Sequence, residues 1–200
     1  MKILILQNRM GIGDMIMFLP FIEAISKKFK TPVTILAKKN TKVEMYFNNK
    51  EIVEEIMYLE REDNKKHSGV KGFFKLVNEL KLKKFDKVFI FNSSLRYFLI
   101  SKFSGIKEVF HYPLFKKKNQ QIIEAAKEFT LKSIGEDVES TPRLFLKEQD
   151  ILKAKKDHSI DQSITNVILG IGGSGKTKRV PASIFKSFMS KVLKLSLIHI

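Results

Sequence analysis

Short apolar runs alternate with longer amphipathic segments over the first two thirds of the chain. Such runs are typical of strands buried on both faces of a parallel sheet, and apolar residues spaced three or four apart are typical of helices. The predicted strands are Lys2–Leu6, Pro32–Leu36, a part of Ile52–Leu59, Lys87–Phe91 and Glu108–Phe110. The predicted helices are a segment after Asp14 that Pro20 must start or kink, then Val43–Phe47, Val70–Leu82, Ser94–Phe103 and Gln120–Ile134. This alternation predicts an α/β fold built on a parallel sheet.

The same pattern restarts in the last third of the chain. A polar segment, Gly135–Pro142, and a charged helix, Glu148–Lys156, precede an apolar run at Asn166–Leu169, a glycine-rich loop and a helix from about Pro181. The order of strand, glycine turn, proline and helix repeats the opening of the chain. We therefore predict a first domain at 1–145, a linker with the charged helix at 146–164 and the start of a second domain at 165–195.

The end of the chain departs from this pattern. Leu195–Ile200 lacks the lysines of the preceding segments, and we interpret 196–200 as a non-native tail. About 35 residues after Asn166 are too few to complete a second domain. We therefore expect the chain to be a truncated fragment.

Composition adds a strong positive charge. The chain has 37 Lys and Arg against 21 Asp and Glu, and its net charge of +16 favours an anionic partner: nucleic acid, phosphorylated sugar, nucleotide or acidic membrane. AT-rich coding would produce the same excess of lysine, so charge alone does not choose among these partners. The absence of cysteine excludes disulfides, and the histidines show no metal-ligand spacing, so no metal site is predicted. Without a signal peptide or a run of about 20 apolar residues, we expect a cytoplasmic protein.

The sequence Gly11-Ile12-Gly13-Asp14 follows the first predicted strand. Glycines allow a tight turn and a close approach of the backbone to a ligand, and parallel sheets bind ligands at the carboxyl ends of their strands. Asp14 could act there as a general base toward a hydroxyl group, or it could merely cap the following helix. A dinucleotide-binding fingerprint is disfavoured, because it needs glycine at the position of Ile16.

Two further motifs leave other functions open. Gly170–Thr177 matches the P-loop pattern G-x-x-x-x-G-K-[ST], which makes a nucleotide-binding NTPase or kinase the alternative function. Pro181 disfavours a true P-loop. In a P-loop a helix begins at the Gly-Lys-Thr sequence, so Pro181 would lie beyond the first turn of that helix, where proline is destabilising. The basic run Lys116–Lys118, with aromatic residues nearby, makes a nucleic-acid-binding module a second alternative.

Taken together, the motifs resemble those of glycosyltransferase family nine, the ADP-heptose:lipopolysaccharide heptosyltransferases. The similar segments are Lys2–Leu6, Gly11–Asp14, Leu19–Pro20, Phe85–Arg96, Ser104–Lys107 and Val167–Phe185. The resemblance implies a GT-B fold with an N-terminal Rossmann-like domain for the acceptor and a second Rossmann-like domain for the nucleotide-sugar.

The resemblance also implies roles for single residues. Asp14 matches the catalytic base, Gly13 and Arg96 match acceptor-binding positions, and Ser174 and Lys178 match contacts to the donor phosphates. The implied reaction is an inverting transfer of heptose from ADP-heptose to an acidic, lipid-linked acceptor of the lipopolysaccharide core. It implies no metal or other cofactor, no nucleic-acid partner, and a peripheral contact with the inner face of the cytoplasmic membrane. Because most of the second domain is missing, we expect this chain to be inactive.

Overall fold

A computed structural model describes residues 1–198 apart from 10, 48, 115–119, 145, 162, 168 and 171–178. The chain divides into two units, Met1–Phe145 and Leu146–Ile200. The first unit contains β1 (Ile3–Gln7), α1 (Ile12–Ile16), α2 (Leu19–Phe29), β2 (Val33–Ala37), η1 (Lys39–Thr41), η2 (Val43–Met45), β3 (Val53–Tyr58), α3 (Gly69–Lys83), β4 (Lys87–Ile90), α4 (Leu95–Phe103), β5 (Glu108–His111) and α5 (Ile122–Ile134). The second unit contains α6 (Glu148–Asp157) and α7 (Ala182–Ile198).

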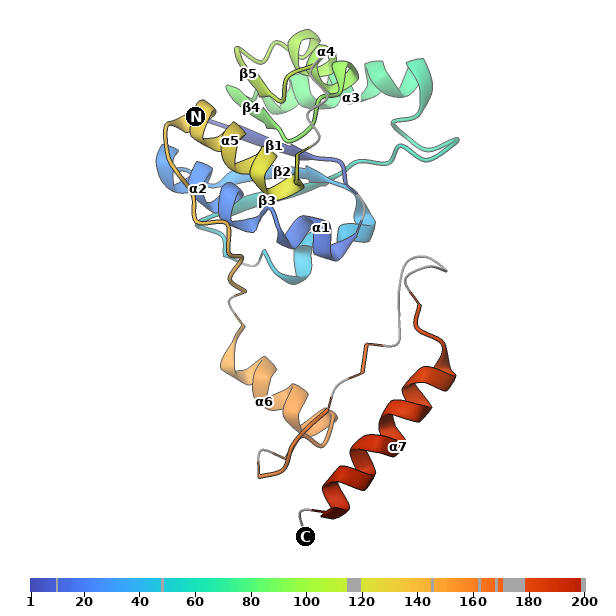
Figure 1. Ribbon diagram of the computed structural model, residues 1–200. Helices are drawn as coiled ribbons and strands as arrows, with labels where there is room; N and C mark the ends of the chain where they lie inside the picture. Colours follow the sequence, from blue (N-terminus) through green and yellow to red (C-terminus); the bar gives the residue numbers. More distant parts are fainter. Residues whose placement is uncertain are drawn as a thin grey trace. The chain divides into compact units, whose positions relative to one another are not determined.

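The first unit is built on a sheet of five parallel strands in the order β3-β2-β1-β4-β5 (Figure 1). β1 lies at the centre, where Ile5 is paired with Ile35 of β2 and Phe89 of β4. The chain runs outward from β1 through β2 to β3 and then returns to place β4 on the other side of β1. Such a reversal of strand order leaves a crevice outside the carboxyl ends of the two central strands.

Helices cover both faces of this sheet (Figure 1). On one face, Ile3 and Ile5 of β1 belong to a core that includes residues of α1, α2 and α5. On the other face, Leu4 and Leu6 belong to a core with residues of α3 and α4. All residues of β1 are therefore buried, which explains why Ile3–Leu6 is a continuous apolar run and not an alternating one. The predicted α/β fold with a parallel sheet is confirmed.

The helix predicted after Asp14 is in fact two helices. α1 ends at Ile16, and α2 begins at Leu19 with Pro20 in its first turn. Proline has no N–H group and clashes with the carbonyl four residues earlier, so it is tolerated in a first turn and interrupts a longer helix. The helix predicted at Val43–Phe47 is likewise reduced to the 3-10 turn η2.

The second unit lacks a sheet among its described residues. None of them is in a strand, and none is buried among those before residue 193. The strand predicted at Asn166–Leu169 is not formed where the structure describes it, because residues 166, 167 and 169 are irregular. A strand needs a neighbour to pair with its backbone groups, and the described part of this unit provides none. No helix in the described part of the chain is both long and apolar enough to cross a membrane.

Candidate active site

The loops that follow β1 and β4 meet at the point where the strand order reverses. The side-chain amide Nδ2 of Asn92 donates a hydrogen bond to Oδ1 of Asn8 over 3.2 Å. Gln7, the last residue of β1, is fully buried, and its Oε1 accepts a hydrogen bond from the backbone N–H of Arg9. The first bond joins the two loops, and the second holds the backbone of Arg9 at the carboxyl-end edge of the sheet.

Asp14 lies in the first turn of α1, directly after the glycine turn. Gly11 occupies the cap position of this helix with a φ of 109°, a conformation that favours glycine. The interpretation of Asp14 as a helix cap is therefore wrong. Its carboxylate is partly exposed and forms no hydrogen bond or ion pair within the described part of the chain. An unpaired carboxylate at this edge is able to accept a proton from a bound hydroxyl group.

Gly13 precedes Asp14 and has an exposed backbone. A Cβ atom added at Gly13 would have no neighbouring atom of the described residues within 4 Å, so these residues leave the space beside it open. A ligand could therefore approach the backbone of α1 here without meeting a side chain. This geometry is compatible with the acceptor contact that the resemblance implies for Gly13.

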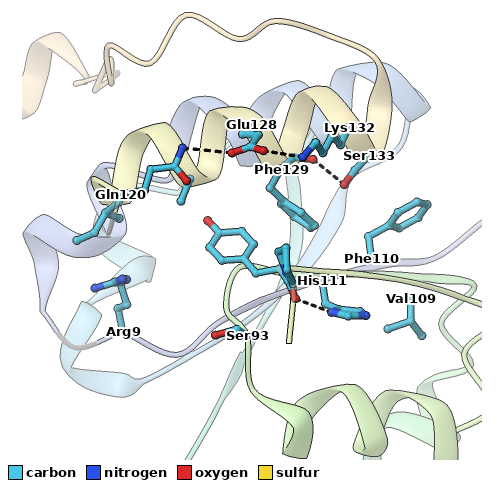
Figure 2. Close-up of a pocket in the computed structure, with 14 residues that line it drawn as sticks. Arg9, Ser93, Val109, Phe110, His111, Gln120, Glu128, Phe129, Lys132 and Ser133 are labelled. Carbon is cyan, nitrogen blue, oxygen red and sulfur yellow. Dashed lines mark hydrogen bonds and ion pairs between the residues drawn. The ribbon is translucent and has the colours of Figure 1, made fainter. Parts of the chain in front are cut away.

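A cavity of about 780 Å³ lies at the same edge of the sheet, between the ends of β4 and β5 and helix α5 (Figure 2). Arg9 from the loop after β1 and Ser93 from the loop after β4 contribute to its wall. Tyr112, which follows β5, and Phe129 of α5 contribute rings that meet edge to face at 5.1 Å between centres. The cavity therefore combines aromatic walls with polar groups from three strand ends.

The hydroxyl group of Tyr112 is buried and has no hydrogen-bond partner among the described residues. Burial raises the pKa of this hydroxyl, and the charge of Arg9 opposes the effect only in part. The group therefore stays protonated at neutral pH and can donate one hydrogen bond. The amide Nε2 of Gln7 is also buried without a described partner. Buried polar groups without partners are costly, so these two atoms mark places where a ligand or a water molecule would be bound.

A histidine and an ion pair of α5 also line the cavity. Nδ1 of His111 lies 2.6 Å from the backbone oxygen of Tyr112, so this nitrogen carries a proton and donates it to that oxygen. On α5, Lys132 donates to Glu128 over 2.6 Å, and Glu128 also accepts a bond from Gln120. Donors, acceptors and cationic groups gathered in one cavity suit a ligand with many hydroxyl or anionic oxygens.

The sequence pattern does not predict this cavity. Its only local signal was the position of His111 and Tyr112 just after a predicted strand, at the edge where parallel sheets bind ligands. Phe129 and Lys132 belong to a helix whose amphipathic pattern is visible in the sequence. The pattern does not show which part of the sheet this helix packs against. The contribution of α5 depends on how this helix packs across the sheet, which no local motif encodes.

Arg96 lies in the first turn of α4, at the carboxyl-end edge but on the face that α3 and α4 cover. Its Nη2 donates hydrogen bonds to the carbonyl oxygens of Gly69 and His67, over 2.8 and 3.1 Å. Its guanidinium carbon lies 5.4 Å from the centre of the Phe73 ring, and burial lowers the pKa of the group. Asp14 belongs to a helix on the opposite face, so the structure does not bring the two residues together. Arg96 joins the start of α3 to α4, and its contact with an acceptor stays a prediction.

The predicted donor-side residues, Ser174 and Lys178, lie outside the described residues. The same holds for 171–177 of the P-loop match and for the basic run Lys116–Lys118. Among the residues that the structure does describe, no group of three or more His, Asp or Glu could hold a metal ion.

No protein-family model and no curated protein matches this sequence. The fold, in contrast, matches solved structures of glycosyltransferases. A family 9 glycosyl transferase from Veillonella parvula DSM 2008 has a TM-score of 0.67 and 17% identity, over 92% of this chain and 57% of that chain. The E. coli ADP-heptose lps heptosyltransferase II has a TM-score of 0.64 and 16% identity, over 97% of this chain and 62% of that one. E. coli heptosyltransferase WaaC with ADP has a TM-score of 0.54 and 14% identity, over 96% of this chain and 64% of that one.

This chain spans 57% to 64% of the length of these three structures. At identities of 14% to 17% the likeness concerns the fold. The resemblance inferred from the motifs is confirmed at that level: the chain has the α/β fold of GT-B heptosyltransferase structures of glycosyltransferase family nine.

Proposed function

We propose that this chain is the acceptor-side part of an inverting glycosyltransferase in which Asp14 is the catalytic base. The observation that carries the proposal is the carboxylate of Asp14, which has no partner among the described residues and lies at the reversal of strand order, in a fold shared with solved glycosyltransferases. Parallel sheets bind ligands at this place, and a carboxylate there can reach a bound hydroxyl group.

In the proposed reaction, the carboxylate of Asp14 accepts the proton of an acceptor hydroxyl as the hydroxyl oxygen attacks the anomeric carbon of the donor sugar. The bond from that carbon to the diphosphate breaks, the nucleoside diphosphate leaves with the electron pair, and the anomeric configuration is inverted. Ser174, Lys178 and the backbone N–H groups of the glycine-rich loop would stabilise the charge of the leaving diphosphate. The proposal includes no metal ion or other cofactor.

The proposed donor is ADP-heptose. Two fold neighbours support it, since one is an ADP-heptose lps heptosyltransferase and the other is a heptosyltransferase with ADP. The proposed acceptor is an acidic, lipid-linked glycan of the lipopolysaccharide core, contacted by Gly13 and Arg96, and the net charge of +16 favours such a partner. We place the reaction in the cytoplasm, at the inner face of the cytoplasmic membrane.

The test is Asp14→Asn in a chain extended to the full length of the fold neighbours, because a GT-B site is completed by both domains. Loss of a general base lowers turnover by about 10²- to 10⁴-fold, so we expect a fall of that size with unchanged binding of the donor. Asp63→Asn, which changes an exposed carboxylate in the loop before α3, should leave turnover unchanged. Turnover by Asp14→Asn equal to that of the parent would disprove the role of this residue.

One sequence feature favours a second function, the P-loop match at Gly170–Thr177. It predicts Mg²⁺-dependent binding of ATP that Lys176→Ala abolishes. The glycosyltransferase proposal predicts instead that ADP binds without Mg²⁺ and that Lys178→Ala weakens this binding. The two titrations, with and without the metal, separate the functions.

A further inference from the structure

The outer face of α3 combines large apolar residues with lysines. Its exposed residues are Gly69, Val70, Lys71, Phe74, Lys75, Asn78, Lys81 and Leu82. Val70 is 73% exposed, Phe74 is 57% exposed and Leu82 is 82% exposed. Single exposed apolar residues are ordinary, but several on one helix face need an explanation.

The apolar part of this face continues onto α4. The ring of Phe74 meets that of Phe73 edge to face at 5.2 Å, and Phe73 meets Phe103 of α4 at 6.0 Å. Phe103, near the end of α4, is itself 63% exposed. The three rings therefore form a continuous aromatic strip across two neighbouring helices. We call this strip, together with the exposed residues of α3, the α3–α4 face.

This strip is held in place from its inner side. Phe73 is only partly exposed, and the guanidinium of Arg96 lies over its ring at 5.4 Å. The same guanidinium is hydrogen-bonded to the carbonyl oxygens of His67 and Gly69 at the start of α3. The aromatic strip is therefore presented on a fixed support, and the function proposed for Arg96 at the acceptor does not explain it.

The charge on this face has a single sign. Lys71, Lys75 and Lys81 of α3 and Lys102 of α4 are exposed. The only acidic residue of the two helices is Glu79, which lies 2.8 Å from Lys66 and 3.1 Å from Nε2 of His67. Glu79 is one helical turn from Lys75, but its carboxylate is paired with Lys66 and His67. Among the described residues, no ion pair neutralises the lysines of the α3–α4 face.

We propose that the α3–α4 face docks the protein on the surface of an anionic lipid bilayer. Exposed aromatic and aliphatic side chains flanked by lysines, with no acidic residue among the exposed ones, are the composition of helices that lie in a membrane interface. The apolar groups enter the boundary of the acyl chains, and the lysines meet the lipid phosphates. A second copy of the chain is a poorer occupant, because a twofold contact of this face would set lysines against lysines.

The proposal rests on the membrane-borne acceptor of the proposed function, but not on the chemistry of Asp14. It assigns the contact with the bilayer to one surface of the first unit. Vesicle binding and sugar transfer are separate measurements, so the failure of one proposal is distinguishable from the failure of the other.

The test is co-sedimentation of the whole chain with vesicles of phosphatidylcholine alone or with a third of phosphatidylglycerol. We expect at least tenfold tighter binding to the anionic vesicles, weakened by salt. The double variant Phe74→Ser/Phe103→Ser should lose most of this binding, and Lys71→Gln/Lys75→Gln/Lys81→Gln should lose its dependence on phosphatidylglycerol. Circular dichroism of each variant establishes that it is folded.

Matched controls use exposed residues away from this face. Met45→Ser/Leu131→Ser removes two exposed apolar residues, and Lys39→Gln/Lys42→Gln/Lys50→Gln removes three exposed charges. Equal binding to both kinds of vesicle would overturn the proposal, and so would equal losses in the control variants and in the variants of the α3–α4 face. A dimer in analytical ultracentrifugation that Phe74→Ser/Phe103→Ser dissociates would assign the face to a second copy instead. Asp14→Asn should bind vesicles as the parent does.

Discussion

The two units of this chain have similar helical patterns but differ in what their helices pack against. In Met1–Phe145, α2 and α5 lie over one face of a parallel sheet whose central strand is fully buried. In Leu146–Ile200, α6 has no buried residue, and Ile184 and Phe188 of α7 are 56% and 46% exposed. The apolar residues of α7 nevertheless recur at helical spacing, as those of α2 do.

This difference shows that an amphipathic pattern specifies a helix face but not its partner. Most of the stability of a protein helix comes from packing its apolar face, and a short helix alone is marginal in water. The sheet provides that partner in the first unit. The described residues of the second unit contain no strand, so the apolar side of α7 has no such cover there.

The largest expected difference between the units is in the loss of stability when one phenylalanine ring is removed from each. Phe89 of β4 is fully buried, stacks on Phe110 at 4.7 Å and contacts Phe29 and Phe129. Phe89→Ala should therefore lower the free energy of unfolding of the first unit by about 3–5 kcal/mol. Phe188→Ala in α7 should change it by less than about 0.5 kcal/mol.

Urea unfolding followed by tyrosine fluorescence measures this contrast. All four tyrosines lie before residue 113 and the chain has no tryptophan, so the signal reports the first unit alone. Equal losses of stability in the two variants would contradict the distinction between the units.

A smaller contrast is expected from adding one methyl group in each unit. A Cβ at Gly72 of α3 would lie 2.2 Å from the backbone carbon of His67, so the chain before α3 would have to move. Overpacking of this kind costs about 1–3 kcal/mol, and Gly72→Ala should destabilise the first unit by that amount. A Cβ at Gly170 of the second unit meets no atom of the described residues within 4 Å. Gly170→Ala is therefore the matched control, and a loss as large as that of Gly72→Ala would show that the contact with His67 is not the cause.

The sequence predicted the first unit well because its signals are local. The runs at Lys2–Leu6 and Lys87–Phe91 are strands within one residue of the predicted bounds, since residues buried on both faces must all be apolar. The same reasoning was wrong at Asn166–Leu169, where the apolar run is present but the described residues show no neighbouring strand. A buried strand depends on its neighbours as much as on its own residues.

The candidate site was predicted only in part, for a related reason. Gly11 and Asp14 were found because a glycine turn after a strand is a local signal, and the φ of 109° at Gly11 explains the glycine. The cavity lined by Tyr112 was not found, because its wall comes from residues far apart in the sequence. The family resemblance implies an acceptor contact for Arg96, which stays a prediction, and its hydrogen bonds depend on the packing of α3 against α4, which no local motif encodes.

The smallest expected difference between the units is in how the effect of removing one carboxylate on stability depends on pH. In the first unit this carboxylate is that of Glu79 in α3. Burial raises the pKa of this carboxyl, but hydrogen bonds from Lys66 and His67 outweigh burial and lower the pKa below its ordinary value of 4.5. A carboxyl whose pKa is lower in the folded state stabilises the fold above the unfolded pKa, and this stabilisation is lost as the pH falls through the folded pKa. The parent should therefore be more stable than Glu79→Gln at pH 6, and the difference should shrink as the pH falls below about 4.5.

Glu148→Gln provides the control in the second unit, because Glu148 is an exposed carboxylate in the first turn of α6. Its substitution should leave the tyrosine-monitored stability of the first unit the same at each pH. The measurement is a series of urea titrations between pH 6 and pH 3. A stability difference for Glu79→Gln that stays constant over this range would mean that the contacts with Lys66 and His67 do not stabilise the charged carboxylate, and that Glu79 supports α3 through packing alone.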